Sequence, residues 1–165
     1  MELKKKIIAS AFAGVIGAAA TFIQPEEGIK FQAYQDSVKV WTVCVGHTGK
    51  DVVKGKRYSQ AECDALFKSD IWIAMEGVLK ATPNVKLPEP VLVSFTSFAF
   101  NVGVDKFRTS TMAKLANSGD FVAACHQLPR WKFAGGYDCS VRSNQCYGVW
   151  TRRLREETNC MSAFK

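Results

Sequence analysis

The sequence lacks the residue spacings of a structural metal site. None of its six cysteines lies in a paired Cys-x-x-Cys ladder or in a Cys/His set that would hold zinc. It also lacks internal repeats, low-complexity tracts and a linker after Pro25, which excludes repeat architectures and a chain of domains. Nothing indicates a metal or a cofactor, and 165 residues suit one globular domain with a short extra segment.

The charge balance is basic, with 22 Lys and Arg against 15 Asp and Glu, a formal net charge of +7. Three of the positive charges are Lys4, Lys5 and Lys6. An excess of this size suits attraction to a polyanion, such as nucleic acid, an anionic membrane or an acidic bacterial wall. Charge alone, however, favours a solvated basic surface without a specific partner.

Six cysteines are many for a chain of this length, and they lie at Cys44, Cys63, Cys125, Cys139, Cys146 and Cys160. An even number without metal spacing favours three disulfides and an oxidising compartment. The alternative is a reduced cytosolic protein with buried free thiols.

An uncharged stretch runs from Ile7 to Ile23, directly after the lysine triplet. As a helix it would be about 25 Å long, against a hydrocarbon core of about 30 Å, so it could cross a membrane only marginally. The positive flank predicts a cytoplasmic N-terminus and an exported body. A retained anchor and a signal cleaved after Ala18–Ala20 both remain open, whereas a buried core helix of a cytosolic protein fits the pattern poorly. We expect residues 1–24 to form this segment and 25–165 a catalytic domain.

The remaining pattern predicts a small sheet followed by helices. β-forming residues over 29–48 indicate antiparallel strands, and a capping box from Ser59 to Glu62 opens a helix to about Lys80. A strongly apolar helix through 91–99, ending near Gly103, is the expected centre of the core. Further helices are expected over 111–117, 120–128 and 149–160, with a loop at Gly135-Gly136. The predicted fold class is α+β with one core.

Two carboxyl residues and a threonine form the most informative group: Glu27, Asp36 in the turn of the first hairpin, and Thr42 on its returning strand. Glycoside hydrolysis needs one protonated carboxyl and one carboxylate. The apolar neighbours Ile29 and Phe31 favour a protonated Glu27, and the hydroxyl of Thr42 could hold a water. On spacing alone, such residues are more often surface decoration than catalytic groups.

The order of motifs resembles the phage-type lysozyme family over essentially everything after Pro25. The motifs are Glu27-x8-Asp36-x5-Thr42, Gly46-His47-Thr48, Leu66–Asp70, Phe100–Gly103 and Arg130-Trp131. The resemblance implies a lysozyme-like fold, mostly helical, with a small antiparallel sheet beside the active-site cleft and a hydrophobic helix in front. It further implies hydrolysis of the β-1,4 bond between N-acetylmuramic acid and N-acetylglucosamine in peptidoglycan, by a monomer that binds no nucleic acid.

The resemblance also implies roles for individual residues. Glu27 would be the general acid, and Asp36 with Thr42 would position the attacking water of an inverting hydrolase. Gly46, Phe100 and Asn101 are expected to line the sugar groove.

A structural pair of His47 with Asp70 is expected beside the site. One of Arg152 and Arg153 is expected to face the site, with the choice open. The expected disulfides, one pairing among many possible, join Cys44 to Cys63, Cys125 to Cys160 and Cys139 to Cys146.

The chain is further similar to the signal-anchor-release endolysins of lambdoid phages. Glu27 lies only four residues beyond Ile23, and in this fold a short helix, here expected within Ala18–Glu26, packs on the body before the catalytic glutamate. The anchored chain would therefore be inactive at the inner membrane, facing the periplasm, and active as a soluble periplasmic enzyme after release. The absence of a cysteine before Cys44 excludes control by disulfide exchange from the anchor. A lytic transglycosylase and a tethered, non-catalytic wall-binding module are the competing interpretations.

Overall fold

The computed structural model describes residues 2–23, 28–36 and 39–165, with only the helical backbone for residues 2–12. Glu27 lies outside the described residues. The elements follow one another as α1 (Glu2–Ile23), β1 (Lys30–Gln35), β2 (Trp41–Cys44), β3 (His47–Thr48), α2 (Gln60–Ala81), α3 (Glu89–Val102), α4 (Val104–Thr109), α5 (Thr111–Asn117), α6 (Phe121–Cys125), β4 (Phe133–Ala134), β5 (Tyr137–Asp138) and α7 (Tyr147–Met161). The predicted α+β fold class, with a small antiparallel sheet and mostly helices, is confirmed.

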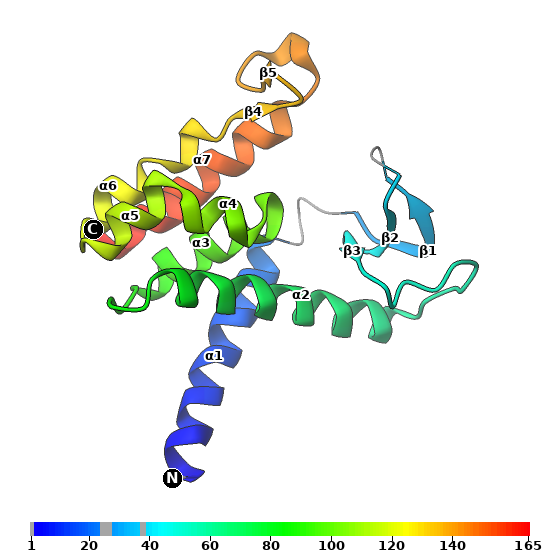
Figure 1. The fold of residues 1–165 in the computed structure, drawn as a ribbon, viewed down its shortest axis with the longest axis horizontal. Coiled ribbons are helices and arrows are strands. Elements are labelled where there is room, and N and C mark those ends of the chain that lie inside the picture. Colours follow the sequence, from blue (N-terminus) through cyan, green and yellow to red (C-terminus); the bar gives the residue numbers. More distant parts are fainter. Residues whose placement is uncertain (1, 24–27, 37–38) are drawn as a thin grey trace.

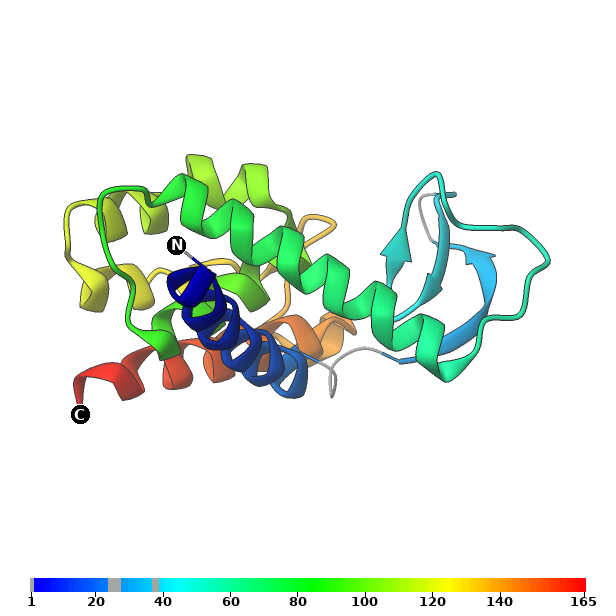
Figure 2. The same ribbon diagram turned by 90° about the horizontal axis from the view of Figure 1, so that it is seen from below.

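The sheet and the helical body form two lobes joined by α2. Strands β1, β2 and β3 pair antiparallel in that order, with Thr42 opposite Tyr34 on one side and Thr48 on the other. Figures 1 and 2 show α2 running from the sheet to the helices. The long helix therefore sets the position of one lobe relative to the other.

The predicted capping box begins α2. The backbone N–H of Glu62 donates to Ser59 Oγ at 3.2 Å, and the Glu62 carboxylate accepts from the Ser59 N–H at 2.8 Å. The helix then buries a stripe that includes Phe67, Ile71 and Met75. These capping bonds satisfy two otherwise unpaired N–H groups of the first turn.

Helix α3 is the centre of the core, as predicted. Its residues 91–99 are all buried, and it lies against α1, α2 and α7. Phe95 and Phe98 pack around Phe107 of α4, with ring centroids 5.3 and 6.3 Å apart. Burial of each such ring stabilises the fold by about 1.5–3 kcal/mol, so this cluster is a main source of stability.

The second half of α1 belongs to the same core. Val15, Ala19 and Ile23, spaced four residues apart, are buried between α1 and the body. This half of α1 therefore packs on the body through one face, while Gly17 and Thr21 on its other side are exposed. Figure 1 shows the first half extending beyond the body. Among the described residues, no helix combines the length and the apolar character needed to cross a membrane.

Three disulfides are present, and they join the pairs expected from the sequence: Cys44–Cys63, Cys125–Cys160 and Cys139–Cys146. The first ties β2 to α2, and the second ties α6 to α7. Each lobe is therefore cross-linked within itself.

One local prediction was wrong, and two elements were not predicted. Helix α6 ends at Cys125 rather than near Leu128, because Pro129 has no N–H to donate to the Cys125 carbonyl; Leu128–Arg130 forms a separate 3-10 helix. Helix α4 was not expected; it follows Gly103, whose φ of 98° separates it from α3. The β4–β5 hairpin was also not expected; Gly135 and Gly136, both with positive φ, form its two-residue turn at the start of the expected loop.

Candidate active site

The turn between β1 and β2 holds Asp36 through its own backbone and side chain. Asp36 Oδ1 accepts a hydrogen bond from the Val40 N–H at 2.8 Å. The Asp36 N–H donates to the Val40 carbonyl at 2.9 Å, and the Lys39 N–H donates to the Asp36 carbonyl at 3.0 Å. Lys39 has a left-handed φ of 67°, which closes the turn tightly. The carboxylate is therefore part of the turn that carries it.

Thr42 is buried on β2 and is bound to the same turn. Its hydroxyl donates to the Val40 carbonyl at 3.2 Å. Thr48 lies directly opposite Thr42, so the two side chains share a face of the sheet. Asp36 and Thr42 are thus both hydrogen-bonded to Val40, one through its N–H and the other through its carbonyl.

A cavity of about 240 Å³ opens between the lobes on the side of Thr48. Its lining comes from the β2–β3 turn, from α2 and from the α3–α4 junction: Gly46, Thr48, Asp70, Ile73, Ala74, Ala99, Phe100, Gly103 and Val104. The Phe100 ring is fixed by an edge contact with Phe67, 5.7 Å between centroids. Gly46 and Phe100 therefore lie together, whereas Asn101, expected beside them, does not line this cavity.

His47 lies at the base of this region between two carboxylates. Its Nδ1 is 2.8 Å from Asp70 Oδ2, and its Nε2 is 3.2 Å from Asp51 Oδ1. Burial by itself would lower the pKa of the imidazole, but hydrogen bonds and charge from Asp70 and Asp51 together raise it above its usual value. The pKa of Asp70 is raised chiefly because burial disfavours its charged form. The cluster ties β3 to α2, and Asp51, four residues after His47, is its unpredicted member.

A second charged cluster is buried between α3 and α7. Arg153 Nη2 donates to Glu156 Oε1 at 2.8 Å and to Asn101 Oδ1 at 3.2 Å, and Ser97 Oγ donates to the same Glu156 oxygen at 2.7 Å. Both ionic side chains are fully buried. Burial raises the pKa of Glu156 to about 7, and burial lowers the pKa of Arg153. Of the two arginines left open by the sequence, Arg153 points into the interior and Arg152 is half-buried.

Glu156 was not singled out from the sequence. The signal was its position three residues after Arg153 on an amphipathic helix, where two side chains meet on one face. Among the described residues, no group of three or more potential ligands could hold a metal ion.

Comparison with known proteins identifies the family. Residues 24–156 match the family model described as phage lysozyme. The SAR-endolysin of Enterobacteria phage PA-2 is 39% identical, over 97% of this chain and 96% of the relative. That of Enterobacteria phage P21 is 38% identical, over 97% and 96%. The solved active form of the P1 phage endolysin Lyz superimposes with a TM-score of 0.78 at 25% identity, over 96% and 95% of the two chains. The chain therefore belongs to the phage lysozyme family, among relatives that are SAR-endolysins.

Proposed function

We propose that the chain is a muramidase that hydrolyses the β-1,4 bond between N-acetylmuramic acid and N-acetylglucosamine in peptidoglycan. Glu27 donates a proton to the leaving oxygen, and Asp36 with Thr42 holds the water that attacks the anomeric carbon. Family membership supports this assignment. The observation that carries it is the shared attachment of Asp36 and Thr42 to Val40, on the sheet whose Thr48 lines the interlobe cavity.

The chemistry needs the two residues to act on one water molecule. A carboxylate accepts a proton from the water as the water attacks, and a hydroxyl beside it fixes the direction of attack. The Val40 N–H restrains the Asp36 side chain, and the Val40 carbonyl restrains that of Thr42. Both side chains are therefore held in place before the substrate binds. An inverting reaction would place the Glu27 and Asp36 carboxyls roughly 6.5–9.5 Å apart, with the water between Asp36 and the sugar.

The reaction is tested with purified protein and isolated peptidoglycan. We expect new reducing ends at N-acetylmuramic acid, with the anomeric configuration inverted when products are examined immediately by NMR. Glu27→Gln and Asp36→Asn should each lose activity, whereas Asp64→Asn, on the exposed first turn of α2, should keep it. Products ending in a 1,6-anhydro sugar would identify a lytic transglycosylase instead. An active Asp36→Asn protein would overturn the role of that carboxylate.

We further propose that residues 1–24 are a releasable membrane anchor and that the enzyme works in the periplasm as a monomer. Ile7 to Ile23 carries no charge, and Lys4–Lys6 precedes it. Val15, Ala19 and Ile23 pack into the body, and the same side chains could not lie in a bilayer at the same time. Anchoring would therefore remove α1 from the domain, and release would return it.

A membrane uncoupler separates a releasable anchor from a cleaved signal. We expect bacteria expressing the full chain to lyse rapidly after uncoupler, with Met1–Lys6 still present on the released protein. Cells expressing Glu27→Gln should not lyse. Lysis without uncoupler, by a protein that begins near Thr21, would show that the segment is a cleaved signal while leaving the muramidase assignment intact.

A further inference from the structure

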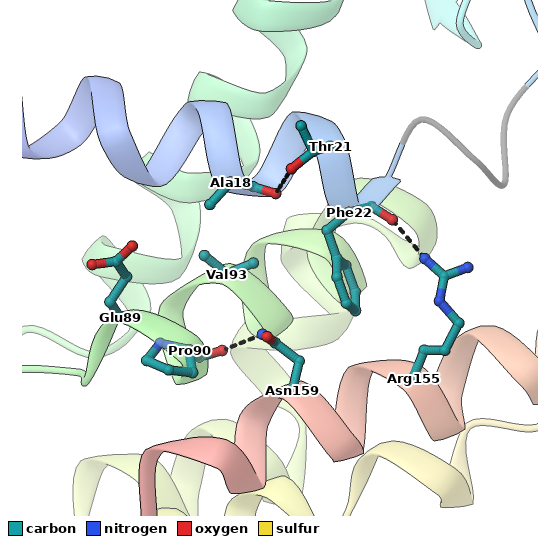
Figure 3. Close-up of a pocket in the computed structure, with 8 residues that line it drawn as sticks. All are labelled: Ala18, Thr21, Phe22, Glu89, Pro90, Val93, Arg155 and Asn159. Atoms are coloured by element: carbon teal, nitrogen blue, oxygen red, sulfur yellow. Dashed lines mark hydrogen bonds between the residues drawn. The ribbon is translucent and has the colours of Figure 1, made fainter.

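Among the described residues, Arg155 of α7 contacts the last turn of α1. Arg155 Nη2 donates to the Phe22 carbonyl at 2.9 Å, and its guanidinium carbon lies 5.2 Å from the centroid of the Phe22 ring. Figure 3 shows the Arg155 side chain reaching from α7 to the last turn of α1. A single side chain thus contacts both the backbone and the ring of Phe22.

The contact is of a favourable kind. Phe22 lies in the last turn of α1, where carbonyl groups have no partner within the helix and carry the negative end of the helix dipole. A guanidinium that donates to such a carbonyl makes a charge-assisted hydrogen bond. Its position over the aromatic face adds a cation–π attraction. Arg155 is half-buried, which reduces the screening of both interactions by solvent.

The position of Arg155 is fixed by contacts that do not involve α1. One helical turn later, the Asn159 side-chain amide donates to the Pro90 carbonyl at 3.0 Å and to Ser94 Oγ at 2.9 Å. These bonds hold α7 against α3, the central helix of the core. Arg155 therefore holds the end of α1 to a helix whose own position is fixed against α3.

Two cavities lie beside the last turn of α1. A cavity of about 510 Å³, lined in part by Thr21, Phe22 and Arg155, lies beside it, and a second of about 480 Å³ also borders Phe22 and Arg155. Both cavities are lined by Phe22 and Arg155, and the Phe22 ring also packs at the edge of the core that buries Ala19 and Ile23. Loss of the arginine would remove the hydrogen bond to the Phe22 carbonyl and leave the apolar packing of the ring.

We propose that Arg155 is a positioning residue, which holds the end of α1 against α7 and thereby places the catalytic Glu27. Glu27 is five positions after Phe22, a chain length that spans at most about 18 Å when extended. Fixing the Phe22 carbonyl restricts where Glu27 can lie. The proposal rests on the proposed muramidase function, and it makes Arg155 the contact through which docking of α1 prepares the site.

The test compares the full chain, purified in soluble form, with Arg155→Ala, Arg155→Lys and the control Arg108→Ala. Arg108 is an exposed residue of α4 that pairs only locally with Asp105. Amide hydrogen exchange reports docking of α1, and steady-state kinetics on solubilised peptidoglycan reports placement of Glu27. For Arg155→Ala we expect exchange over residues 15–23 to rise about tenfold, with α3 unchanged. We also expect kcat to fall about tenfold with little change in KM, since the sugar groove is intact.

Arg155→Lys should recover part of both effects, because a lysine keeps the charge but not the forked geometry. Wild-type exchange over residues 15–23 in Arg155→Ala would overturn the proposal. Faster exchange throughout the domain, with a general loss of thermal stability, would also overturn it by showing a merely structural role. If the wild-type chain proved inactive on peptidoglycan, the muramidase assignment would fail, and exchange would still decide whether Arg155 holds α1.

Discussion

Ser97 on α3 and Glu156 on α7 are joined by a 2.7 Å hydrogen bond in the interior of the helical body, 59 positions apart in the chain. The same Glu156 oxygen accepts from Arg153 at 2.8 Å. The Ser97–Glu156 bond joins α3 to α7 through polar atoms, and Arg153 holds the Glu156 carboxylate from within α7. Because the Glu156 carboxyl can gain or lose a proton, the free energy of unfolding depends on pH.

The raised pKa of Glu156 predicts the direction of that dependence. Folding moves this pKa from its usual 4.5 to about 7, so the folded state favours the protonated carboxyl. The resulting stabilisation is fully present below about pH 4.5 and is lost as pH rises through about 7. Glu156→Gln should remove this component. Urea unfolding at pH 5 and pH 8 would show it as a smaller pH difference in the variant than in wild type, with Glu76→Gln as the surface control. An unchanged pH difference in Glu156→Gln would contradict the prediction.

Thr42→Val should separate activity from stability. Valine keeps the shape of threonine but loses the hydroxyl that donates to the Val40 carbonyl. Stability should fall by only about 1 kcal/mol, whereas activity on peptidoglycan should fall roughly 100-fold if the hydroxyl helps to position water. The surface variant Thr109→Val serves as the control for both measurements. Full activity in Thr42→Val would remove Thr42 from the catalytic group.

Gly77 on α2 should not tolerate a methyl group. A Cβ built there would lie 2.5 Å from both methyl carbons of Val104. Because a β-branched valine has few rotamers with which to move aside, Gly77→Ala should destabilise the fold by about 1–3 kcal/mol. Gly148 on α7 has no atom within 4 Å of such a position, and Gly148→Ala should be neutral or stabilising by up to about 1 kcal/mol. Thermal unfolding of both variants tests this difference in stability. Equal stability changes in the two variants would contradict the prediction.

The Cys125–Cys160 disulfide should contribute more stability than Cys139–Cys146. The first joins residues 35 apart and the second residues 7 apart, and a longer closed loop restricts the unfolded chain more strongly. Replacing Cys125 and Cys160 together by alanine should cost about 2–4 kcal/mol. The matched double replacement of Cys139 and Cys146 should cost less. Denaturant unfolding under identical oxidising conditions compares them, and the reverse order would show that native-state contacts outweigh loop length.

The sequence predicted elements with strong local signals and missed those set by tertiary contact. The Ser59–Glu62 box located the start of α2, and unbroken apolarity over 91–99 identified α3 as central. Short elements such as α4 and the β4–β5 hairpin carry too few residues for a clear period, although Gly135-Gly136 was itself a hairpin signal. The expected extension of α6 to about Leu128 was wrong because Pro129 cannot donate a hydrogen bond to the Cys125 carbonyl.

The candidate site shows the same division. The spacing of Asp36 and Thr42 gave a hairpin that brings both to one turn, because hairpin geometry is local. The sequence spacing already places Asp51 near His47 and Glu156 near Arg153. These neighbours indicate a role for each pair only when the burial of the side chains is also known. The lining contributed by Ile73 and Val104 depends on how α2 meets the α3–α4 junction, which no local pattern encodes.

The burial of Ala19 limits how the N-terminal segment can be redesigned. Its side chain is fully inaccessible in the core between α1 and the body, so a leucine there would make the segment more lipophilic and overfill the core at the same time. Any substitution on this face must fit the packed protein interior and also keep the segment apolar enough for its environment before docking. The small side chains of α1 are therefore a compromise between lipophilicity and fit, and strengthening one property weakens the other.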